Sequence, residues 1–306
     1  MNVLVTGGAG FIGSHITEEF IRDGHNVTVF DSLRSGYKKN IEDISGVKFI
    51  LGDVRDMDTL LTVTRDMELI VHLAALISVP ESMEAPLETV DINTKGTLNV
   101  LQASVRNNVR KVILASSAAN YGDNPVVPKK EDMIPEPKSP YAVTKLDGEY
   151  YLDIFRQYHG LETTSLRFFN VFGPRQDQAS AYAAAIPIFT FKALKNEDLI
   201  IFGDGEQTRD FIYVKNIVDA IRLVSDKGTG VFNVACGGRI TINDLANKIV
   251  HIIGSSSKIV YREPRPGDVK HSTADISKIK SLGFFPKINL EEGLKKTIDY
   301  MSGDRI

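Results

Sequence analysis

The chain opens with a short apolar run that leads directly into a glycine-rich turn. Residues 1–14 read MNVLVTGGAGFIGS, in which Val3–Val5 is typical of a strand and an apolar stripe at helical spacing follows the turn. Glycine permits a tight turn and a close approach of the backbone, and a helix N-terminus offers free N–H groups at the positive end of its dipole. This order predicts a binding site for the pyrophosphate of a dinucleotide. The residues predicted to contact the dinucleotide here are Gly7, Gly10, Phe11, Ile12 and Gly13.

An acidic residue ends the second strand pattern of the chain. Asp31 follows Val27–Phe30, the position at which a carboxylate accepts hydrogen bonds from the adenosine ribose hydroxyls and repels a 2′-phosphate. The alternative is that Asp31 only caps the loop after the strand. Because the glycines lie upstream, the cofactor interpretation is favoured, and we expect NAD rather than NADP.

Length and composition bound the fold and the partners. With 306 residues the chain exceeds the usual size of a single core, so two lobes are expected. A formal net charge of −3 gives no global attraction to nucleic acid or to an anionic membrane. Cys236 is the single cysteine, so no intramolecular disulfide can form. The chain begins without a charged leader, and no apolar stretch approaches the ~18 residues of a membrane span, so we expect a cytoplasmic protein.

Strand patterns alternate with longer helical patterns through the first half. The further strand patterns are Lys48–Leu51, Leu69–Leu73, Lys111–Ala115 and Thr163–Phe169. The helical patterns are Asp56–Arg65, Leu87–Asn108 and Ser139–His159. Such alternation predicts an α/β fold, a doubly wound parallel sheet of Rossmann type with helices on both faces. Ligands of such sheets bind outside the carboxyl ends of the strands.

Three features near these strand ends suit a cofactor. Gly52–Val54 ends the strand pattern at 48–51 with a polar residue, and an adenine ring can lie beside it. Leu73–Ala75 is small or apolar where a bulky side chain would block a ligand, although plain packing is the alternative. Asn93 lies in a helical pattern, where a buried amide needs a partner, and a satisfied core amide is the alternative. The residues predicted here to line the cofactor site are Asp53, Val54, Leu73, Ala74, Ala75 and Asn93.

A proline-rich stretch separates two serines from the next helical pattern. Ser116 and Ser117 follow the strand pattern at 111–115, and Asp123–Pro140 then carries prolines and charges at a density that predicts an exposed loop. The loop delivers the chain to Tyr141 at the start of a helix.

Tyr141 and Lys145 are four residues apart, so both side chains leave one face of the helix. A phenol acting as a base near neutrality needs its pKa lowered by roughly three units, about 4 kcal/mol. A nearby ammonium and the positive charge of an oxidised nicotinamide both favour the phenolate. Ser117 can pass a hydrogen bond between Tyr141 and a substrate hydroxyl. The alternative, a surface tyrosine beside a solvated lysine, loses weight because the dinucleotide signature is present.

Further motifs extend the pattern along nearly the whole chain. They are GGAGFIG at 7–13, Asp31, Asn93, Ser117, YAVTK at 141–145, RFFNVFGP at 167–174, RDFIYV at 209–214 and RPGD at 265–268. Together they resemble the extended short-chain dehydrogenase/reductase family, its nucleotide-sugar branch, and most closely the UDP-hexose 4-epimerases.

The resemblance implies oxidation and re-reduction at carbon 4 of a UDP-linked sugar. Tyr141 would remove the 4-hydroxyl proton while hydride passes to NAD, and hydride would return to the other face of the 4-keto sugar. Lys145 would bind the nicotinamide ribose and lower the pKa of Tyr141, and Ser117 would position the hydroxyl. The residues that the resemblance assigns to the substrate are Ser117, Asn170, Ala184, Phe202, Arg209, Arg265, Asp268 and Ser272.

The resemblance also implies a division of the chain and an assembly. Residues 1–170 with 209–240 would form the NAD-binding domain, with another strand at Val231–Ala235. Residues 171–208 with 241–306 would form a smaller α/β lobe for the nucleotide sugar. The helices 87–108 and 141–159 match those that pair two subunits in the family, so a homodimer is expected.

Departures from the patterns of related branches narrow the reaction. Related dehydratases carry an Asp-Glu pair directly after the serine or threonine, and decarboxylases keep a glutamate there, whereas this chain has Ala118 and Ala119. Epimerases of UDP-glucuronate usually carry a second arginine after GPRQ, whereas this chain has Asp177. A non-catalytic NAD-binding sensor is the remaining alternative, disfavoured because a sensor has no need of an acidic phenol.

Small residues at sugar-facing positions of the family suggest a wide substrate range. Galactose-restricted epimerases often carry a lysine where Ile77 stands and a bulky aromatic where Ser272 stands. Ala184 and Ser116 match small positions of relatives that accept N-acetylhexosamines. We therefore expect turnover of UDP-GlcNAc and UDP-GalNAc as well as UDP-glucose and UDP-galactose.

Overall fold

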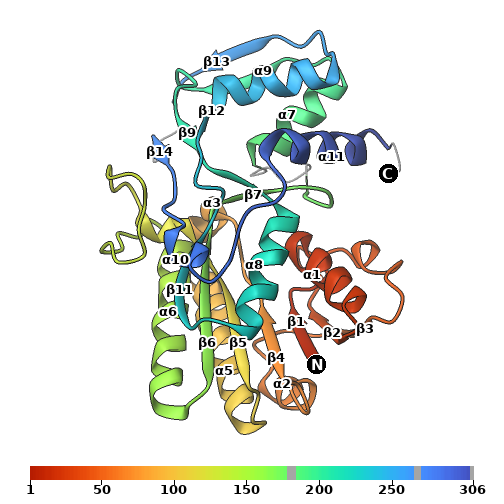
Figure 1. Ribbon diagram of the computed structural model, residues 1–306, viewed down its shortest axis with the longest axis vertical. Coiled ribbons are helices and arrows are strands. Elements are labelled where there is room, and N and C mark those ends of the chain that lie inside the picture. The colour runs from red at the N-terminus through yellow and green to blue at the C-terminus, as the bar shows by residue number, and fades with distance from the viewer. Residues whose placement is uncertain (178–183, 265–269, 304–306) are drawn as a thin grey trace.

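The computed structural model describes residues 1–177, 184–264 and 270–303 (Figure 1). Its large sheet has seven strands, all parallel, in the order β11-β6-β5-β4-β1-β2-β3. The strands are β1 (Asn2–Thr6), β2 (Asn26–Asp31), β3 (Lys48–Leu51), β4 (Leu69–His72), β5 (Lys111–Ser117), β6 (Glu162–Phe168) and β11 (Gly230–Val234). The strand order reverses at β1, where β2 lies on one side and β4 on the other, and a crevice at this point is where doubly wound sheets bind dinucleotides. The predicted fold class is confirmed.

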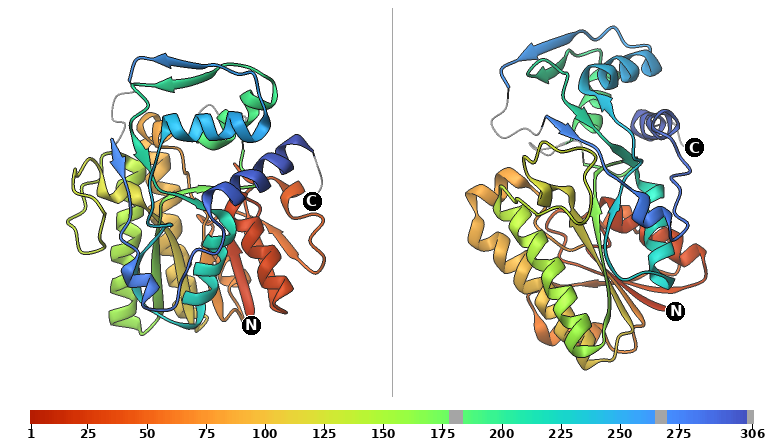
Figure 2. Two further views of the ribbon diagram at one scale, coloured as in Figure 1. Left: turned by 45° about the horizontal axis from the view of Figure 1, so that its top comes forward. Right: turned by 60° about the vertical axis from the view of Figure 1, so that its left-hand side comes forward.

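Helices cover both faces of the large sheet (Figure 2). On one face α1 (Phe11–Arg22) and α8 (Val214–Asp226) pack against Val3, Val5 and Val71. On the other face α2 (Met57–Val63), α5 (Gly96–Arg106) and α6 (Pro140–His159) pack against Leu4, Ile70 and Leu114. Successive strand residues point to opposite faces, so runs such as Val3–Val5 are apolar throughout because both faces are buried.

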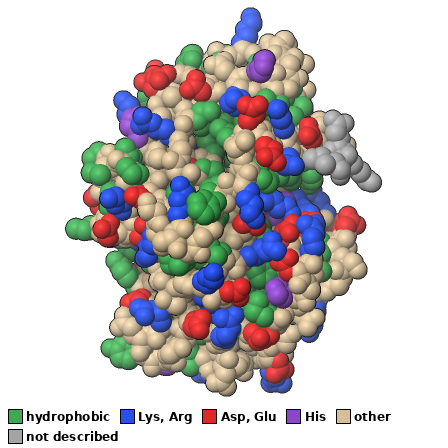
Figure 3. Space-filling model, in the orientation of Figure 1, with side chains coloured by type: hydrophobic (Ala, Val, Ile, Leu, Met, Phe, Trp, Pro, Cys, Tyr) green, Lys and Arg blue, Asp and Glu red, His purple; other side chains and the backbone are tan. Residues whose placement is uncertain are grey.

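Charged side chains lie interspersed over the helices α1 and α8 (Figure 3). Arg222 of α8 pairs with Asp23 at 2.5 Å, and Lys215 pairs with Glu19 of α1. These pairs join the outer surfaces of two helices whose inner faces share one apolar cluster. Among the described residues, no helix is long and apolar enough to span a bilayer.

The helix predicted over Leu87–Asn108 is divided into three pieces. It consists of α4 (Pro86–Val90), the π-helical segment η2 (Asp91–Lys95) and α5, and a short helix α3 (Val79–Glu84) precedes it. Gly96 begins α5 against Val54, and a Cβ at Gly96 would come within 2.6 Å of the Val54 side chain. The widened turn coincides with Asn93, and hydrophobic periodicity could not predict it because its apolar stripe continues through the turn.

The segment Asp123–Pro140 is only in part the exposed loop that was predicted. Within it Lys129 is buried, and it forms an isolated bridge with Ala274. Lys129 N donates to the Thr273 carbonyl at 2.7 Å, and Asp275 N donates to the Lys129 carbonyl at 2.8 Å. The loop is thereby attached to a distant part of the chain, a long-range pairing that composition does not reveal.

The smaller lobe has its own apolar core above the carboxyl edge of the large sheet (Figures 1 and 2). Its helices are α7 (Ala185–Leu194), α9 (Ile242–Ile253) and α11 (Leu290–Ser302). Its strands form the pair β8 (Leu199–Phe202) with β13 (Ile259–Arg262). A three-stranded sheet of β12 (Ile240–Thr241), β9 (Thr208–Arg209) and β14 (His271–Ser272) lies beside the pair β7 (Asn170–Phe172) with β10 (Phe211–Tyr213).

Part of the segment assigned to the smaller lobe packs elsewhere. Ala274, Ile276, Ile279 and Phe284 belong to the apolar cluster of the large sheet, which also receives α10 (Ser277–Lys280). The predicted range 241–306 is therefore shared between the two cores. The remaining short helices are η1 (Lys38–Asn40) and η3 (Ala118–Tyr121).

A buried histidine ends β4, and its hydrogen bonds indicate its tautomer. Thr97 donates its hydroxyl proton to the Asn93 carbonyl at 2.6 Å, so Thr97 Oγ1 accepts from Nε2–H of His72 at 3.0 Å. His72 Nδ1 then accepts from the hydroxyl of Thr6 at 2.7 Å. Burial lowers the pKa of His72 from 6.5 to about 3, so the imidazole is neutral near pH 7.

We predict that His72 makes the fold sensitive to acid. Below pH 6.5 the unfolded chain binds a proton at this histidine and the folded chain does not. The free energy of unfolding therefore decreases as the pH is lowered. At pH 5.0 the loss amounts to about 2 kcal/mol, at about 1.4 kcal/mol per pH unit. The free energy of unfolding, measured with urea at several pH values between 7.5 and 5.0, should fall about 2 kcal/mol less in His72→Gln than in wild type. An unchanged pH dependence in the variant would show that the folded protein protonates His72.

Candidate active site

The glycine turn after β1 is packed too closely for any side chain. Gly7 has φ +71°, and its N–H donates to the Phe30 carbonyl at 2.9 Å. A Cβ at Gly7 would lie 2.8 Å from Ala74 N, and a Cβ at Gly13 would lie 2.2 Å from the Gly7 carbonyl oxygen. Gly10 is the N-cap of α1 and contributes no side-chain cap. The first turn of α1 therefore presents backbone N–H groups at the positive end of the helix, which fits the pyrophosphate of NAD.

Asp31 ends β2 beside this turn, and its carboxylate has backbone partners. Asp31 accepts hydrogen bonds from Ala9 N at 2.9 Å and from Leu33 N at 2.8 Å. Burial raises the pKa of Asp31, and the two backbone hydrogen bonds act in the opposite direction. The capping role is therefore real, and it leaves each oxygen a second lone pair with which to accept from a ribose hydroxyl. The two interpretations of Asp31 are compatible.

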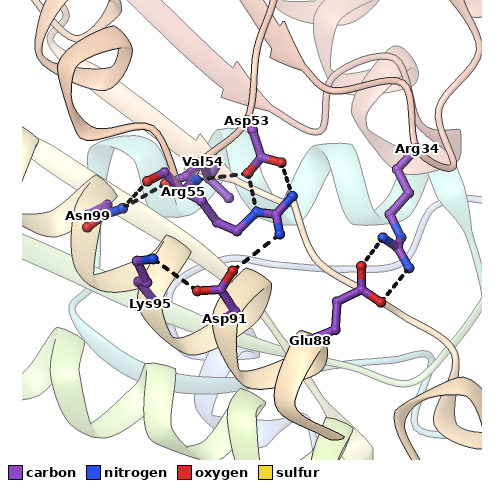
Figure 4. A network of polar contacts seen from close by, with 8 residues as sticks. All are labelled: Arg34, Asp53, Val54, Arg55, Glu88, Asp91, Lys95 and Asn99. Carbon is purple, nitrogen blue, oxygen red and sulfur yellow. Dashed lines mark hydrogen bonds and ion pairs between the residues drawn. The ribbon is translucent and has the colours of Figure 1, made fainter. Parts of the chain in front are cut away.

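Asp53 is held by the arginine two positions further along. Arg55 donates to both carboxylate oxygens of Asp53, at 3.0 and 2.6 Å, and to Asp91 at 3.2 Å (Figure 4). The arginine lowers the pKa of Asp53. Val54 is buried against Gly96, and its carbonyl accepts a hydrogen bond from Asn99 at 3.1 Å. Sequence reasoning missed Arg55, although an arginine two residues from a predicted ligand-facing carboxylate is a visible signal.

The loop after β4 is fixed by a chain of buried hydroxyl groups. Thr6 Oγ1 accepts from Leu73 N and Ala74 N, both at 3.3 Å, and it donates to His72. This arrangement sets Ala74 against Gly7 at the floor of the crevice. Sequence reasoning missed Thr6 and His72 because a threonine and a histidine at strand ends have no distinctive spacing.

The side chain of Asn93 is hydrogen-bonded to the backbone of the same loop. Its Oδ1 accepts from Leu76 N at 2.7 Å, and its Nδ2 donates to the Leu76 carbonyl and to Thr144 Oγ1, both at 3.0 Å. Each amide group thus has a protein partner, which supports the alternative of a satisfied core amide. The structure gives Asn93 the role of a positioning residue that joins the loop after Ala75 to α6.

Tyr141 and Lys145 lie one turn apart at the start of α6, on the same side of the helix. Ser139 caps the helix and accepts from Ala142 N at 3.2 Å. Lys145 Nζ donates to the Ala115 carbonyl at 2.9 Å and lies 5.8 Å from the Tyr141 ring centroid. The Ser117 side chain lies near enough to the Tyr141 hydroxyl to lower the pKa of that phenol. The predicted triad therefore meets at the carboxyl end of β5.

The pKa of Tyr141 shifts in the direction opposite to the expected one. Burial raises the pKa of Tyr141, and the Ser117 side chain only partly opposes this effect. Burial also lowers the pKa of Lys145 to about 8. Desolvation penalises both charged forms, so the lysine alone does not make this phenol acidic. A further positive charge, such as that of an oxidised nicotinamide, is needed to favour the phenolate.

A buried ion pair lies beneath the triad. Glu149, one turn beyond Lys145 in α6, accepts from Arg167 of β6 at 2.9 and 2.7 Å. It also accepts from Ser116 Oγ at 2.5 Å and from Asn120 Nδ2 at 2.9 Å. Ser116 therefore packs under α6, and the expectation that it adds room beside a sugar is wrong. Glu149 was missed, although its position eight residues after Tyr141 places it on the same helix face.

The residues assigned to the nucleotide sugar come together where the chain crosses between the lobes. Ser272 pairs in register with Arg209, and Asn170 Nδ2 donates to the Asp210 carbonyl at 3.0 Å. The buried Asp210 carboxylate accepts from Cys236 N at 3.0 Å, Gly237 N at 2.9 Å and Ala274 N at 3.3 Å. Burial raises the pKa of Asp210 to about 6. One carboxylate thus gathers three crossing segments beside Arg209 and Ser272.

The other predicted substrate residues are less closely joined. Ala184 is exposed at the N-terminus of α7, and Phe202 is half-buried at the end of β8. Ile77 is exposed in the loop after β4. Arg265 and Asp268 lie outside the described residues.

Comparisons with known proteins extend over the whole chain. A family model described as the NAD dependent epimerase/dehydratase family matches residues 3–235. A UDP-glucose 4-epimerase of Mycolicibacterium smegmatis is 37% identical over 308 residues, with 98% of each chain covered.

Two solved structures are similar throughout. A UDP-N-acetylglucosamine 4-epimerase from Methanobrevibacter ruminantium is 44% identical with a TM-score of 0.95, and 99% of each chain is covered. A UDP-glucose 4-epimerase from Thermotoga maritima is 40% identical with a TM-score of 0.96, again over 99% of each chain. The glycine turn, Asp31 and the triad on β5 and α6 thus occur in a chain whose full length matches such enzymes, and this NAD-dependent protein belongs to the NAD dependent epimerase/dehydratase family.

Proposed function

We propose that the protein is a 4-epimerase of UDP-linked hexoses. The observation that carries the proposal is the meeting of Ser117, Tyr141 and Lys145 at the carboxyl end of β5, next to the crevice over β1. The similar enzymes of known structure support the substrate class. NAD bound in the crevice would supply the reversible acceptor of hydride from carbon 4 of the sugar.

The residues of the triad divide the proton chemistry among them. Tyr141 would accept the proton of the sugar 4-hydroxyl and return it after the 4-keto sugar has turned. Ser117, whose side chain lies near the Tyr141 phenol, would hold that hydroxyl and relay its proton. Lys145 would orient the nicotinamide ribose and add positive charge near the phenol. Its bond to the Ala115 carbonyl fixes its Nζ beside β5.

The two lobes would divide the ligands. The glycine turn with Asp31, Asp53, Val54 and the loop at 73–75 would hold NAD, in a domain of residues 1–170 and 209–240. Asn170, Arg209 and Ser272 would contact the nucleotide sugar where these segments meet the smaller lobe, whose core is built from parts of residues 171–208 and 241–306. The support is their convergence around Asp210.

This chain lacks the side chains that other reactions of nucleotide sugars require. Ala118 and Ala119 follow Ser117 in η3 and can neither donate nor accept a proton, which disfavours elimination of water and decarboxylation. Asp177, which accepts a hydrogen bond from Tyr37 at 3.0 Å, stands where a cation would be needed for a sugar carboxylate.

Tyr141→Phe tests the proposed function. The variant keeps the ring and removes the group that accepts the proton, so kcat for UDP-galactose should fall by about 10²–10⁴-fold. Bound NAD, measured by its absorbance after protein denaturation, should be retained. Tyr300→Phe, an exposed position on α11, is the matched control and should keep full activity. A Tyr141→Phe enzyme of normal kcat would remove the proposal and leave a sensor as the better hypothesis.

We further propose that the enzyme turns over N-acetylated as well as plain UDP-hexoses. Ser272 is small, lies beside Arg209 and is half-buried, so no large side chain stands at this position. Ala184 is small and exposed. A 2-acetamido group needs such room, and an aromatic residue at 272 would fill it.

The substrate range is tested with four sugars and one substitution. Wild-type enzyme should convert both UDP-GlcNAc and UDP-galactose in coupled assays. Ser272→Tyr should lower kcat/KM for UDP-GlcNAc and UDP-GalNAc by about tenfold or more, the order expected for a filled pocket, and change the plain hexoses far less. Ser272→Thr adds one methyl group and serves as the control. Equal losses on both sugar types would contradict the role of Ser272, and no turnover of N-acetylated substrates would remove the claim.

We also propose that two copies associate through α4 and α6. Val143, Tyr150, Ile154 and Tyr158 are exposed at spacings of 7, 4 and 4 residues, which places them in one stripe along α6. Leu87 of α4, at 85%, is the most exposed large apolar residue in the part of the chain that the structure describes. A contiguous apolar surface of this kind is typical of an interface between protein chains.

Charge on this stripe should separate the subunits. Leu87→Glu combined with Ile154→Glu places carboxylates in the centre of the proposed contact, so sedimentation should report a monomer where the wild type is a dimer. Phe285→Glu introduces the same charge at an exposed position outside the stripe and should leave the dimer intact. A wild-type monomer, or a dimer insensitive to both carboxylates, would exclude this interface.

A further inference from the structure

Arg34 joins the loop after β2 to the two helices that follow β4, near the end of β1. The sheet order places β1 between β2 and β4, so the loop after β2 and the helices after β4 flank the glycine turn. Arg34, in the first of these loops, donates to both oxygens of Glu88 in α4, at 2.5 and 3.2 Å (Figure 4). It also donates to Glu81 of α3 at 2.9 Å. The ion pairs therefore connect the two sides that flank the carboxyl end of β1.

The loop that carries Arg34 is anchored to the glycine turn. Tyr37 N donates to the Ala9 carbonyl at 3.0 Å, and Asn40 Nδ2 donates to the same carbonyl at 2.9 Å. Asp31 holds Leu33 N at the start of the loop. Both ends of the loop are thus fixed on the strand side of the crevice, and its Arg34 side chain reaches the opposite side.

A second bridge repeats this arrangement one strand further out. Arg55, after β3, reaches Asp91 in η2, three residues beyond Glu88 along the same helical stretch (Figure 4). Positions three apart lie on one side of a helix, so Glu88 and Asp91 receive arginines from two different loops on a common face. The α4–η2 stretch is therefore tied to the edge of the sheet that forms the adenosine side of a dinucleotide crevice.

We propose that the Arg34–Glu88 ion pair, together with Glu81, is a latch that slows the release of NAD. The proposal rests on the proposed NAD site at the glycine turn and Asp31. A dinucleotide held there occupies the crevice whose two sides the pairs connect, so the pairs must open before it leaves. All three side chains are about 40% exposed, so the latch is screened by salt and opens without unfolding.

Release of labelled NAD from the holoenzyme tests the latch. Enzyme loaded with radiolabelled NAD is mixed with excess unlabelled NAD, and bound label is followed with time. Arg34→Gln, which loses both ion pairs, should release NAD about five- to tenfold faster than wild type, and Glu88→Gln, which keeps the pair with Glu81, should release it nearly as fast. The double variant should be no faster than Arg34→Gln. Glu291→Gln, which breaks an exposed pair with Lys248 in the smaller lobe, is the matched control and should release at the wild-type rate.

Salt dependence and a weaker variant complete the test. Raising NaCl from 0.05 to 0.5 M should accelerate release from wild type and not from Arg34→Gln, which keeps neither ion pair. Glu81→Gln, which removes one of the three hydrogen bonds, should accelerate release two- to threefold. Fast release from Arg34→Gln with wild-type release from Glu88→Gln would overturn the proposal, because Arg34 would then contact the dinucleotide itself. Equal rates in all variants would also overturn it while epimerase activity stands, whereas a wild type without bound NAD or turnover would refute the proposed function instead.

Discussion

The buried contact between α6 and the sheet is the constraint on which the catalytic geometry depends. Tyr141, Lys145 and Glu149 lie on one face of this helix, at successive intervals of four residues. Lys145 binds the Ala115 carbonyl, and Glu149 binds Arg167 with Ser116. Because removing one partner leaves a buried charge, such a pair is costly to break. It fixes the rotation of α6 about its axis and so directs Tyr141 toward Ser117.

The crevice over β1 is fixed in a different way, by the absence of side chains and by hydrogen bonds to backbone. Gly7 and Gly13 leave no space for a Cβ, and Thr6 holds the loop at Ala74 against the turn. His72 and Asn93 extend this support to α5 and α6. The cofactor side and the catalytic side of the site therefore share one buried polar network, in which Asn93 binds Thr144, the neighbour of Lys145.

Much of this architecture could be predicted from local pattern. The glycine spacing, the apolar strand runs and the Tyr141–Lys145 spacing each reflect a short-range rule, and all three appear where the rules place them. Local sequence pattern did not predict the features that depend on long-range contacts. The π-helical turn at Asn93, the burial of Lys129 and the contact of Arg55 with Asp91 each depend on a partner from another part of the chain. The burial that raises the pKa of Tyr141 could not be predicted either, because spacing reports a neighbouring charge and does not report burial.

The return of residues 274–284 to the large sheet links the two lobes more closely than a hinge would. Ile276, Ile279 and Phe284 fill the apolar layer beside α8, after the chain has already passed through the smaller lobe. A fragment that ends at residue 240 would lack these side chains and expose part of that layer to water. The dinucleotide fold of this protein is thus completed by residues 274–284, and we infer that residues 1–240 do not form an independent folding unit.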